Sequence, residues 1–433
     1  MAWTACPGTP LRGELQIPGD KSISHRAIML AALADGSSRI TGFLESEDAR
    51  ATEEIFRAMG VVIEAPGEGV RVVHGVGIDG LQPPQGVLDC GNSGTAMRLL
   101  AGLLAGQAFD TTLAGDASLS QRPMRRVSAP LGRMGARIEA QHGDRPPLII
   151  HGNNALQAVD IETEVASAQV KSALLLAGLY AQGTTRVREP RPTRDYTERM
   201  LAAFGWPVEF TPGQASLSGG YRLRATEVAV PADFSSAAFF IVAATLVPGS
   251  QLRLQRVGMN PRRTGLLHVL RAMGADIVEE PAGEQGGEPV ANLVVRHAPL
   301  RGIEVPVEHV ADMIDEFPIL FIAAACAEGR TSVRGAAELR VKESDRIAVM
   351  ADGLRTLGIQ VEETPDGATI HGGALGGGRI DSHGDHRVAM AFAVAGQLAA
   401  GPVHIADTAN VATSFPGFIA TAAAAGFGLG PAA

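Results

Sequence analysis

Long apolar runs recur along the chain, and each is followed by a turn glycine and a β-prone run. The first is RAIMLAALADGSSRI, residues 26–40, and five similar segments follow it. Their turn glycines are Gly36, Gly106, Gly183, Gly249, Gly329 and Gly401, which lie 66 to 80 residues apart. This pattern predicts a buried helix, a turn and a strand that repeat six times.

A second pattern recurs out of phase with the first. It is a helix that ends on a large apolar residue, followed by a glycine and a short strand. Its glycines are Gly60, Gly135, Gly205, Gly274, Gly358 and, in a weaker copy, Gly426. Glycine directly after the last turn commonly takes the left-handed conformation that ends a helix. Two markers with one period therefore predict six compact units, each with two helices and several strands.

The length of the chain divides these units between domains. A chain of 433 residues is too long for one ordinary core. Six units split naturally into two α/β domains of three. With links near residues 18–20 and 228–232, we expect one discontinuous domain, 1–19 plus 230–433, and a second domain, 20–229.

Composition excludes several classes of protein. Acidic residues outnumber basic ones, 46 to 37, and no long basic run is present, so nucleic acid is not an expected partner. The N-terminus lacks a basic start followed by an apolar run, and no apolar stretch reaches the roughly 18 residues of a membrane helix. We therefore expect a cytoplasmic protein without a membrane partner.

The cysteine and histidine pattern gives no metal site. The three cysteines are scattered and form no CxxC pair, which argues against a disulfide framework or structural zinc. His383 and His386 have an HxxH spacing, but no third ligand lies nearby in sequence. No GxGxxG fingerprint follows a strand, and no P-loop is present. We expect no metal, nucleotide or dinucleotide.

Polar residues of the types that cap helices or contact anions accompany the starts of the apolar helices. The six stretches read GDKSISHR, GNSGTAMR, ASAQVKS, ADFSSAA, DMIDEFP and GDHRVAM. Lys21, Arg26 and Arg387 lie where the helix dipole disfavours a positive charge. Each stretch alone could be an ordinary N-cap, but a bound anion would explain the set. The sequence thus favours an anion-binding site built from several helix starts.

Two further stretches carry candidate acid–base groups. In DMIDEFP, Asp315 lies beside Glu316 among apolar residues, so one carboxylate can be desolvated and tuned as a base. In LRVKESDR, Glu343 and Arg346 are i, i+3 neighbours on an expected helix, where a surface ion pair is the simpler interpretation.

Taken in order, seven stretches resemble the motifs of the 5-enolpyruvylshikimate-3-phosphate synthase family. They are GDKSISHRA, GNSGTAMR, GDASLSQRPM, ASAQVKSALLLAG, RVKESDR, GDHRVAM and TSFPGF, and together they span nearly the whole chain. The resemblance implies two domains, each of three βαβαββ-type units, known as the enolpyruvyl transferase fold or inverse α/β barrel. It also implies transfer of the enolpyruvyl group of phosphoenolpyruvate to the 5-hydroxyl of shikimate 3-phosphate, through a tetrahedral intermediate. The family implies no cofactor, and we expect a monomer.

The resemblance further implies roles for individual residues. Contacts to shikimate 3-phosphate fall on Lys21, Ser22, Arg26, Ser167, Ala168, Gln169, Arg194, Asp315 and Lys342. Contacts to phosphoenolpyruvate fall on Lys21, Gly94, Arg122, Gln169, Arg346 and Arg387. Asp315 is similar to the family's proton acceptor and Glu343 to the carboxylate that handles the methylene proton, while Lys21 completes the catalytic set.

Two departures resemble the glyphosate-tolerant class II subgroup. Thr413 and Ser414 stand where part of the family has a lysine, and Leu99 stands where many members have proline. Gly94 nevertheless leaves room for the herbicide's phosphonate, so inhibition by glyphosate is expected.

Two other functions remain open at this stage. One is the sister enolpyruvyl transferase that acts on UDP-N-acetylglucosamine, although GDASLSQRPM lacks the loop cysteine that this enzyme commonly uses. The other is a non-catalytic anion-binding protein on the same scaffold.

Overall fold

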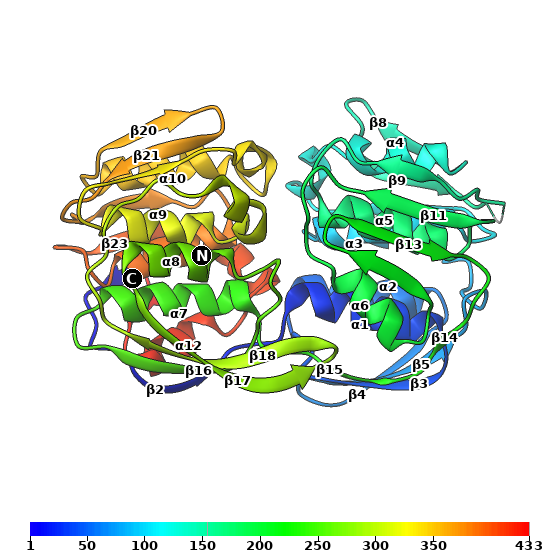
Figure 1. The fold of residues 1–433 in the computed structure, drawn as a ribbon, viewed down its shortest axis with the longest axis horizontal. Coiled ribbons are helices and arrows are strands. Elements are labelled where there is room, and N and C mark those ends of the chain that lie inside the picture. The colour runs from blue at the N-terminus through cyan, green and yellow to red at the C-terminus, as the bar shows by residue number, and fades with distance from the viewer. Residues whose placement is uncertain (154, 433) are drawn as a thin grey trace. The chain divides into compact units, whose positions relative to one another are not determined.

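The computed structural model describes residues 1–153 and 155–432 (Figure 1). The chain divides into two compact units, which we name by their place in the sequence. The N/C unit comprises Met1–Pro18, Pro231–Glu284 and the residues from Pro289 onward. The central unit comprises Gly19–Val230 together with Gln285–Glu288, the tip of a hairpin. Each unit has a separate hydrophobic core.

Three sheets are described in the central unit, and each combines parallel with antiparallel strand contacts. The first runs β14 (Leu223–Arg224), β3 (Ala34–Thr41), β5 (Val70–Val76), β4 (Val62–Gly67), with β15 (Glu227–Ala229) also pairing with β3. The second runs β6 (Leu88–Asp89), β7 (Thr111–Ala114), β9 (Arg145–His151), β8 (Arg137–Gln141). The third runs β10 (Asp160–Glu162), β11 (Thr184–Arg188), β13 (Gln214–Ser218), β12 (Val208–Thr211).

Helices of two kinds accompany these sheets. The buried ones are α1 (Lys21–Leu33), α3 (Gly94–Ala105) and α5 (Ala168–Gly178), which are apolar around most of their circumference. The others are α2 (Glu47–Ala58), α4 (Arg125–Arg133) and α6 (Tyr196–Ala203), which expose one face; a short 3-10 helix, η1 (Leu119–Gln121), precedes α4. A Cβ at Gly102 would lie 2.0 Å from the carbonyl oxygen of Ala173. Glycine therefore permits the close packing of α3 on α5.

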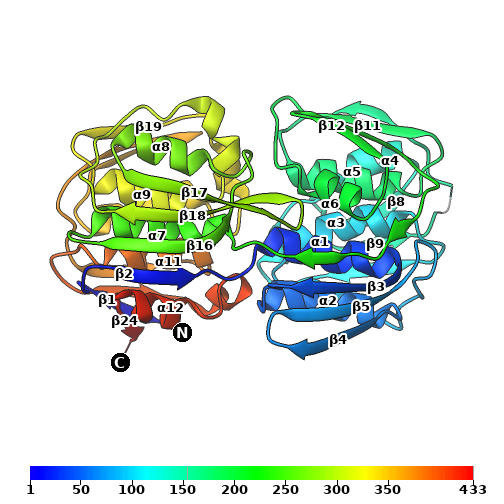
Figure 2. The ribbon, with the colours of Figure 1, turned by 60° about the horizontal axis from the view of Figure 1, so that its bottom comes forward.

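The N/C unit is described with three further sheets. The first runs β22 (Gly378–Asp381), β23 (Val403–Ala406), β1 (Trp3–Cys6), β24 (Gly428–Pro431). The second runs β17 (Asp276–Gln285), β18 (Glu288–Arg296), β16 (Gln251–Gly258), β2 (Arg12–Gln16), and Figure 2 shows these strands side by side in that order. The third runs β19 (Arg330–Val333), β21 (Gly367–His371), β20 (Val361–Thr364).

The helices of the N/C unit repeat the division into buried and half-exposed elements. Buried are α7 (Phe234–Leu246), α9 (Phe317–Ala325) and α11 (His386–Ala395). More exposed are α8 (Gly265–Met273), α10 (Arg346–Thr356) and α12 (Phe418–Ala425). Short 3-10 helices connect them: η2 (Val307–His309), η3 (Ala311–Met313), η4 (Ala337–Val341) and η5 (Ala409–Thr413).

The helix ends expected from the sequence are confirmed. All six glycines predicted to end helices, Gly60, Gly135, Gly205, Gly274, Gly358 and Gly426, have φ between +80° and +108°. A left-handed backbone here turns the chain from helix to strand, and glycine adopts it without a Cβ penalty.

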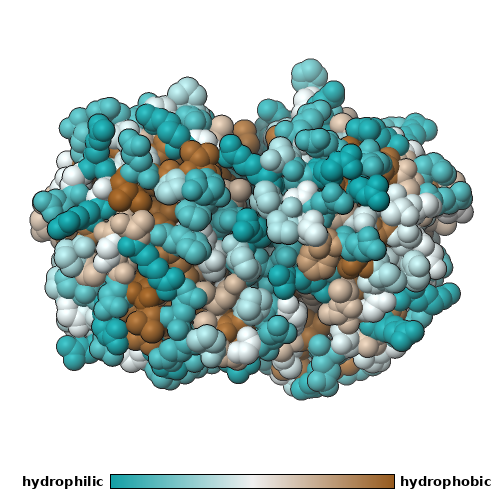
Figure 3. Space-filling view, in the orientation of Figure 1, coloured by the Kyte–Doolittle hydropathy of each residue, from teal (hydrophilic) through white to brown (hydrophobic). Residues whose placement is uncertain are grey.

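The surface in view is mostly hydrophilic (Figure 3), although hydrophobic residues make up 45% of the chain. In the view of Figure 3, hydrophilic residues cover most of each unit and the hydrophobic patches are small and separate. Over the described residues, none of the helices has both the length and the apolar character needed to cross a membrane. The three cysteines all lie in the described part and none forms a disulfide.

Candidate active site

The residues predicted for the site fall into two groups, one in each compact unit. The central cluster comprises Lys21, Ser22, Arg26, Gly94, Arg122, Ser167, Ala168, Gln169 and Arg194. The N/C cluster comprises Asp315, Lys342, Glu343, Arg346 and Arg387.

The first turn of α1 carries the earliest of these residues. Asp20 caps the helix, because its Oδ1 accepts a hydrogen bond from the backbone N–H of Ile23 at 2.9 Å. Lys21 is the first helical residue, and its Nζ lies 3.1 Å from Oδ2 of the buried Asp48. The ammonium group is thus held at the helix start by a carboxylate from α2, and about a sixth of the lysine side chain stays exposed, 17%.

Arg26 lies one turn further along α1 and is buried. Its Nε donates to Thr197 Oγ1 at 2.7 Å, its Nη2 to Ser172 Oγ at 2.9 Å and its Nη1 to the Ser22 carbonyl at 2.9 Å. Burial, and next the charge of Arg194, lower the pKa of Arg26 to about 10, so it stays ionised at neutral pH. Arg194 is thus near enough for its charge to act on Arg26, and two neighbouring arginines suit a doubly charged phosphate.

Further residues of the central cluster surround the start of α3. Ser93 caps this helix, since its Oγ accepts a hydrogen bond from the Ala96 N–H at 3.1 Å. A Cβ added to Gly94 would lie 2.9 Å from Arg98 Nη1 and 3.2 Å from Arg122 Nη1. The absence of that Cβ leaves the start of α3 open to two guanidinium groups, which is a suitable place for an anion.

Side-chain contacts join this group to the start of α5. Gln169 Oε1 accepts from Arg98 Nη1 at 2.8 Å, and Gln169 Nε2 donates to Thr95 Oγ1 at 3.0 Å. Arg122 Nη2 donates to Asn92 Oδ1 at 2.9 Å. The structure therefore brings Gly94, Arg122 and Gln169 together, although they come from segments far apart in the sequence.

The start of α5 supplies Ser167 and Ala168, both buried. Ser167 is the N-cap residue, yet its side chain makes no hydrogen bond to the helix. A hydroxyl that does not cap its own helix, next to the positive end of the helix dipole, is suited to bind an oxyanion.

Behind the central cluster, His25 connects three helices. Its Nδ1 lies 2.7 Å from Thr52 Oγ1 and its Nε2 lies 3.3 Å from Ser93 Oγ. Burial, followed by the charges of Lys21 and Arg26, lowers the pKa of His25 to about 3. The imidazole is therefore neutral at physiological pH, and it ties α1 and α2 to the cap of α3.

The N/C cluster is organised around Arg346, the first residue of α10. Its Nη2 lies 2.6 Å from Glu343 Oε2, its Nε 2.8 Å from Asp385 Oδ2 and its Nη1 3.8 Å from Asp315 Oδ1. Burial alone would lower the pKa of Arg346, but Asp385 and Glu343 outweigh it and raise that pKa. The guanidinium is consequently a fixed positive charge that joins three carboxylates.

Asp385 also sets the start of α11. Its Oδ1 accepts hydrogen bonds from the backbone N–H groups of Arg387, at 2.9 Å, and Val388, at 3.4 Å. Arg387, the second residue of this helix, is buried. One carboxylate thus fixes both Arg346 and the helix that carries Arg387.

One sequence expectation about this cluster changes. Glu343 does not lie on a helix with Arg346, because α10 begins only at Arg346 after the cap residue Asp345. The ion pair exists nonetheless, and it is formed from the loop. Lys342 Nζ lies 2.7 Å from Glu338 Oε1, a residue of η4 that was not among the predicted ones.

Asp315 and Glu316 differ strongly in their surroundings. The side chain of Asp315 is 15% exposed, whereas that of Glu316 is fully buried at 0%. Burial raises the pKa of Glu316, and the charge of Arg263 opposes this rise. Of the two adjacent carboxylates, Asp315 is the one that a substrate can reach.

Sequence reasoning missed several buried charges that support the site. Arg263 contacts Asp315, Asp385 holds Arg346, and Lys171 lies on α5 between Glu189 and Glu198. Lys171 gave a detectable signal, because a charged residue inside the apolar run ASAQVKSALLLAG needs a buried partner. Arg263, in the loop stretch NPRRTG, gave none.

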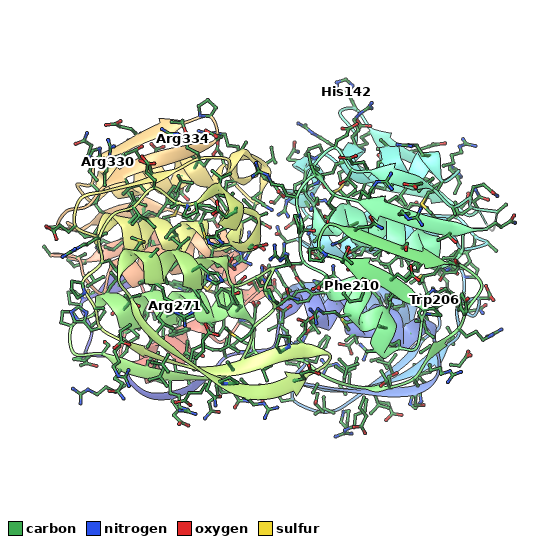
Figure 4. The ribbon with its side chains drawn as sticks, viewed as in Figure 1. His142, Trp206, Phe210, Arg271, Arg330 and Arg334 are labelled. Atoms are coloured by element: carbon green, nitrogen blue, oxygen red, sulfur yellow. The ribbon has the colours of Figure 1, made fainter. Side chains whose placement is uncertain are left out.

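The described residues hold no group of three His, Cys, Asp or Glu side chains placed to bind a metal ion. His142, for example, is exposed and is part of no such group among the described residues. Figure 4 shows it at the tip of the hairpin between β8 and β9, pointing away from the rest of the unit.

Comparisons with known proteins give a consistent result. The family model described as EPSP synthase (3-phosphoshikimate 1-carboxyvinyltransferase) matches residues 6–421. The 3-phosphoshikimate 1-carboxyvinyltransferase of Xanthomonas euvesicatoria pv. vesicatoria is 68% identical over 427 residues, covering 99% of this chain and 97% of the relative. The enzyme of the same name from Xanthomonas axonopodis pv. citri is 69% identical over 427 residues, with coverage of 99% and 97%.

Solved structures agree with these relatives. An EPSP synthase from Acinetobacter baumannii has a TM-score of 0.89 and 50% sequence identity, and the match covers 100% of both chains. The enolpyruvyl transferase NikO from Streptomyces tendae has a TM-score of 0.79 at 18% identity, over 99% of this chain and 98% of that one. At that identity, NikO supports the fold alone.

Proposed function

Because this chain belongs to the EPSP synthase family, we propose that the central cluster and the N/C cluster bind its two substrates. Its activity is that of a 3-phosphoshikimate 1-carboxyvinyltransferase, which transfers the enolpyruvyl group of phosphoenolpyruvate to shikimate 3-phosphate in the shikimate pathway. Each substrate carries a phosphate and a carboxylate. The enzyme must therefore gather cations, for which arginine forks and helix N-termini are suited.

The gathering of Gly94, Arg122 and Gln169 around Arg98 is the observation that carries the phosphoenolpyruvate assignment. We assign phosphoenolpyruvate to six residues. In the central cluster they are Lys21, Gly94, Arg122 and Gln169, and in the N/C cluster they are Arg346 and Arg387. We assign shikimate 3-phosphate to Lys21, Ser22, Arg26, Ser167, Ala168, Gln169, Arg194, Asp315 and Lys342. The effect of the Arg194 charge on Arg26 supports a phosphate that contacts both.

The proposed chemistry is addition followed by elimination. Asp315 accepts the proton of the 5-hydroxyl as that oxygen attacks C2 of phosphoenolpyruvate, while C3 gains a proton. Glu343 donates that proton to C3, and it takes a proton back from the resulting C3 methyl group as the tetrahedral ketal loses phosphate, which re-forms the C2–C3 double bond. Lys21, at the start of α1, contacts both substrates. General acid–base groups of this kind typically contribute about 10²–10⁴-fold in rate.

Phosphate release distinguishes this function from its rivals. We expect release when the protein is mixed with phosphoenolpyruvate and shikimate 3-phosphate, and none when UDP-N-acetylglucosamine replaces the second substrate. Release with the nucleotide sugar alone would identify the sister transferase. If no phosphate is released with either acceptor, although calorimetry shows that phosphoenolpyruvate still binds, the protein is a non-catalytic anion-binding protein.

We also propose that the six sheets are copies of one βαβαββ-type unit. The order β10, α5, β11, α6, β12, β13 supports this, as does the order β6, α3, β7, α4, β8, β9. In the N/C unit, β2, α7, β16, α8, β17, β18 has the same order. On this basis residues 1–19 plus 230–433 form one domain and 20–229 the other. From the family resemblance, we further propose that the enzyme is a cytoplasmic monomer.

We place the enzyme in the class II subgroup, on RVKESDR, PTRDYTE, Leu99 and the Thr413–Ser414 pair. Gly94→Ala is then expected to raise the inhibition constant for glyphosate by about 10–200-fold, the range for one methyl group that a pocket must accommodate. Turnover should change less, because the added Cβ meets the ends of the Arg98 and Arg122 side chains, which can shift.

Gly132→Ala is the matched control for this change, since a Cβ at Gly132 of α4 meets nothing within 4 Å. Inhibition constants from steady-state phosphate release should separate the two variants. An unchanged constant in Gly94→Ala would remove this residue from the inhibitor's binding site.

A further inference from the structure

Arg263 lies among three carboxylates and one hydroxyl of the N/C unit. Its Nη1 lies 3.2 Å from Asp315 Oδ2, and its Nη2 lies 3.5 Å from Asp233 Oδ1 and 3.8 Å from Glu316 Oε1. Its Nη2 also donates to Ser235 Oγ. Only 5% of the arginine side chain is exposed. A buried guanidinium with this many partners has little freedom to move.

The partners of Arg263 are themselves fixed. Asp233 caps α7, because its Oδ1 accepts a hydrogen bond from the Ser235 N–H at 2.8 Å. The hydroxyl of Ser235 donates to Glu316 Oε1. The backbone N–H of Arg263 donates to the Asn260 carbonyl at 2.8 Å, in the turn before α8. The guanidinium is therefore anchored to the start of a buried helix.

Arg263 and Arg346 both contact Asp315, and their contacts are not equivalent. Arg346 Nη1 is 3.8 Å from Asp315, but Arg346 makes shorter contacts to Glu343, at 2.6 Å, and Asp385, at 2.8 Å. Arg263 approaches Asp315 to 3.2 Å, closer than it approaches Asp233 or Glu316. Arg346 thus makes its shorter contacts to other carboxylates, and Arg263 is the nearer of these two arginines to Asp315.

Several acidic groups lie near Asp315 and Arg263. Glu316 is adjacent in sequence and adds a carboxylate, and Arg387 lies near enough to act on the Glu316 charge. Asp233, Glu343 and Asp385 are further carboxylates in contact with the two arginines. Without Arg263, the acidic groups would dominate, and a carboxylate among like charges is harder to ionise.

We propose that Arg263 is a positioning residue for proton transfer, which keeps Asp315 ionised and oriented while Asp233, Ser235 and Glu316 fix the guanidinium. This proposal rests on the role of Asp315 as proton acceptor in the proposed function. Arg263 belongs to the NPRRTG loop, which lies outside the seven stretches that resemble the family motifs.

The test compares Arg263→Gln and Arg263→Lys with wild type in a pH profile of kcat, measured by phosphate release. In Arg263→Gln, the acidic limb should move to higher pH by about 1–3 units, because a carboxylate that loses an adjacent cation gains a proton more readily. Its kcat at neutral pH should fall about 10–100-fold, the loss of a hydrogen bond between charged groups. The KM values should change little, since Arg263 contacts neither substrate in this proposal.

Arg263→Lys restores the charge without the fork, so its acidic limb should return to the wild-type position while kcat recovers only in part. If Arg263→Gln does not fold, as judged by circular dichroism, Arg263→Lys carries the test alone. A displaced limb in a folded Arg263→Lys would then overturn the proposal.

Arg262→Gln is the matched control, since this neighbouring arginine is 34% exposed and pairs with Asp312 at 3.3 Å. It should keep the wild-type profile. A wild-type limb in Arg263→Gln, with activity lost in Asp315→Asn, would overturn the role of Arg263 alone. Full activity in Asp315→Asn would instead overturn the role of Asp315 and, with it, the basis of this proposal.

Discussion

Asp315→Asn should lower kcat by about 10²–10⁴-fold, because the amide cannot accept the proton of the 5-hydroxyl. Asparagine has nearly the same shape and can still contact Arg263, so the KM values and the folded structure should be largely kept. Steady-state phosphate release at saturating phosphoenolpyruvate and shikimate 3-phosphate measures the effect, with circular dichroism as the check on folding.

Two matched variants make this result specific. Asp312→Asn introduces the same change three positions earlier, at a side chain that pairs with Arg262. Glu316→Gln neutralises the adjacent carboxylate, which is fully buried at 0% exposure and whose pKa burial raises. Both should retain far more activity than Asp315→Asn. A loss confined to Glu316→Gln would transfer the role of base to that residue.

Lys171→Met should destabilise the protein by about 3–5 kcal/mol, the cost of leaving buried charges without their partner. Lys171 Nζ lies 2.8 Å from Glu189 Oε2 and 2.9 Å from Glu198 Oε1, and the three side chains are 2%, 0% and 2% exposed. Methionine fills a similar volume, so the loss is electrostatic. The midpoint of urea unfolding measures the effect.

The pH dependence of this loss follows from the carboxylates. Burial raises the pKa of Glu198, with Lys171 opposing that rise, and removal of the cation must raise it further. A carboxyl whose pKa is raised by folding stabilises the folded state at low pH, and this contribution is lost as pH rises through the folded value. The deficit of Lys171→Met should therefore be larger at pH 7 than at pH 5.

Arg186→Met on β11 is the control for this variant. Its ion pair with Asp160 has a comparable distance, 3.2 Å, but the two side chains are 44% and 47% exposed. Exposed pairs contribute about 0–1 kcal/mol, so this variant should unfold close to wild type. If both variants lose the same free energy of unfolding, burial does not determine how much the Lys171 ion pairs stabilise the protein.

The elements of the fold could be predicted because their signals are local. Apolar runs at helical length and glycines after the last turn determine where helices begin and end, and Gly60 and Gly274 indeed have φ of +89° and +107°. The ordered motifs also predict which residues form the site, through the family resemblance. Such signals depend on neighbours a few positions away, so the chain carries them without reference to its packing.

The electrostatics of the site could not be predicted in this way. Nothing in DMIDEFP indicates that Glu316 is buried while Asp315 stays accessible, since both follow the same apolar run. The helix expected around Glu343 is a loop, because the Asp345 side chain caps α10 by accepting from the Ala348 N–H. Local pattern leaves such alternatives open, and packing selects one of them.

By itself, the sequence determined where helices and strands alternate, the glycine helix ends and the family motifs, because each is encoded within a short stretch. Only the tertiary structure decided that Arg98 meets Gln169, that Lys171 lies between Glu189 and Glu198, and that Arg263 contacts Asp315. These partners are between 18 and 71 residues apart in the chain. The charge that a buried group carries depends on which distant groups pack against it, and that is settled only when the chain folds.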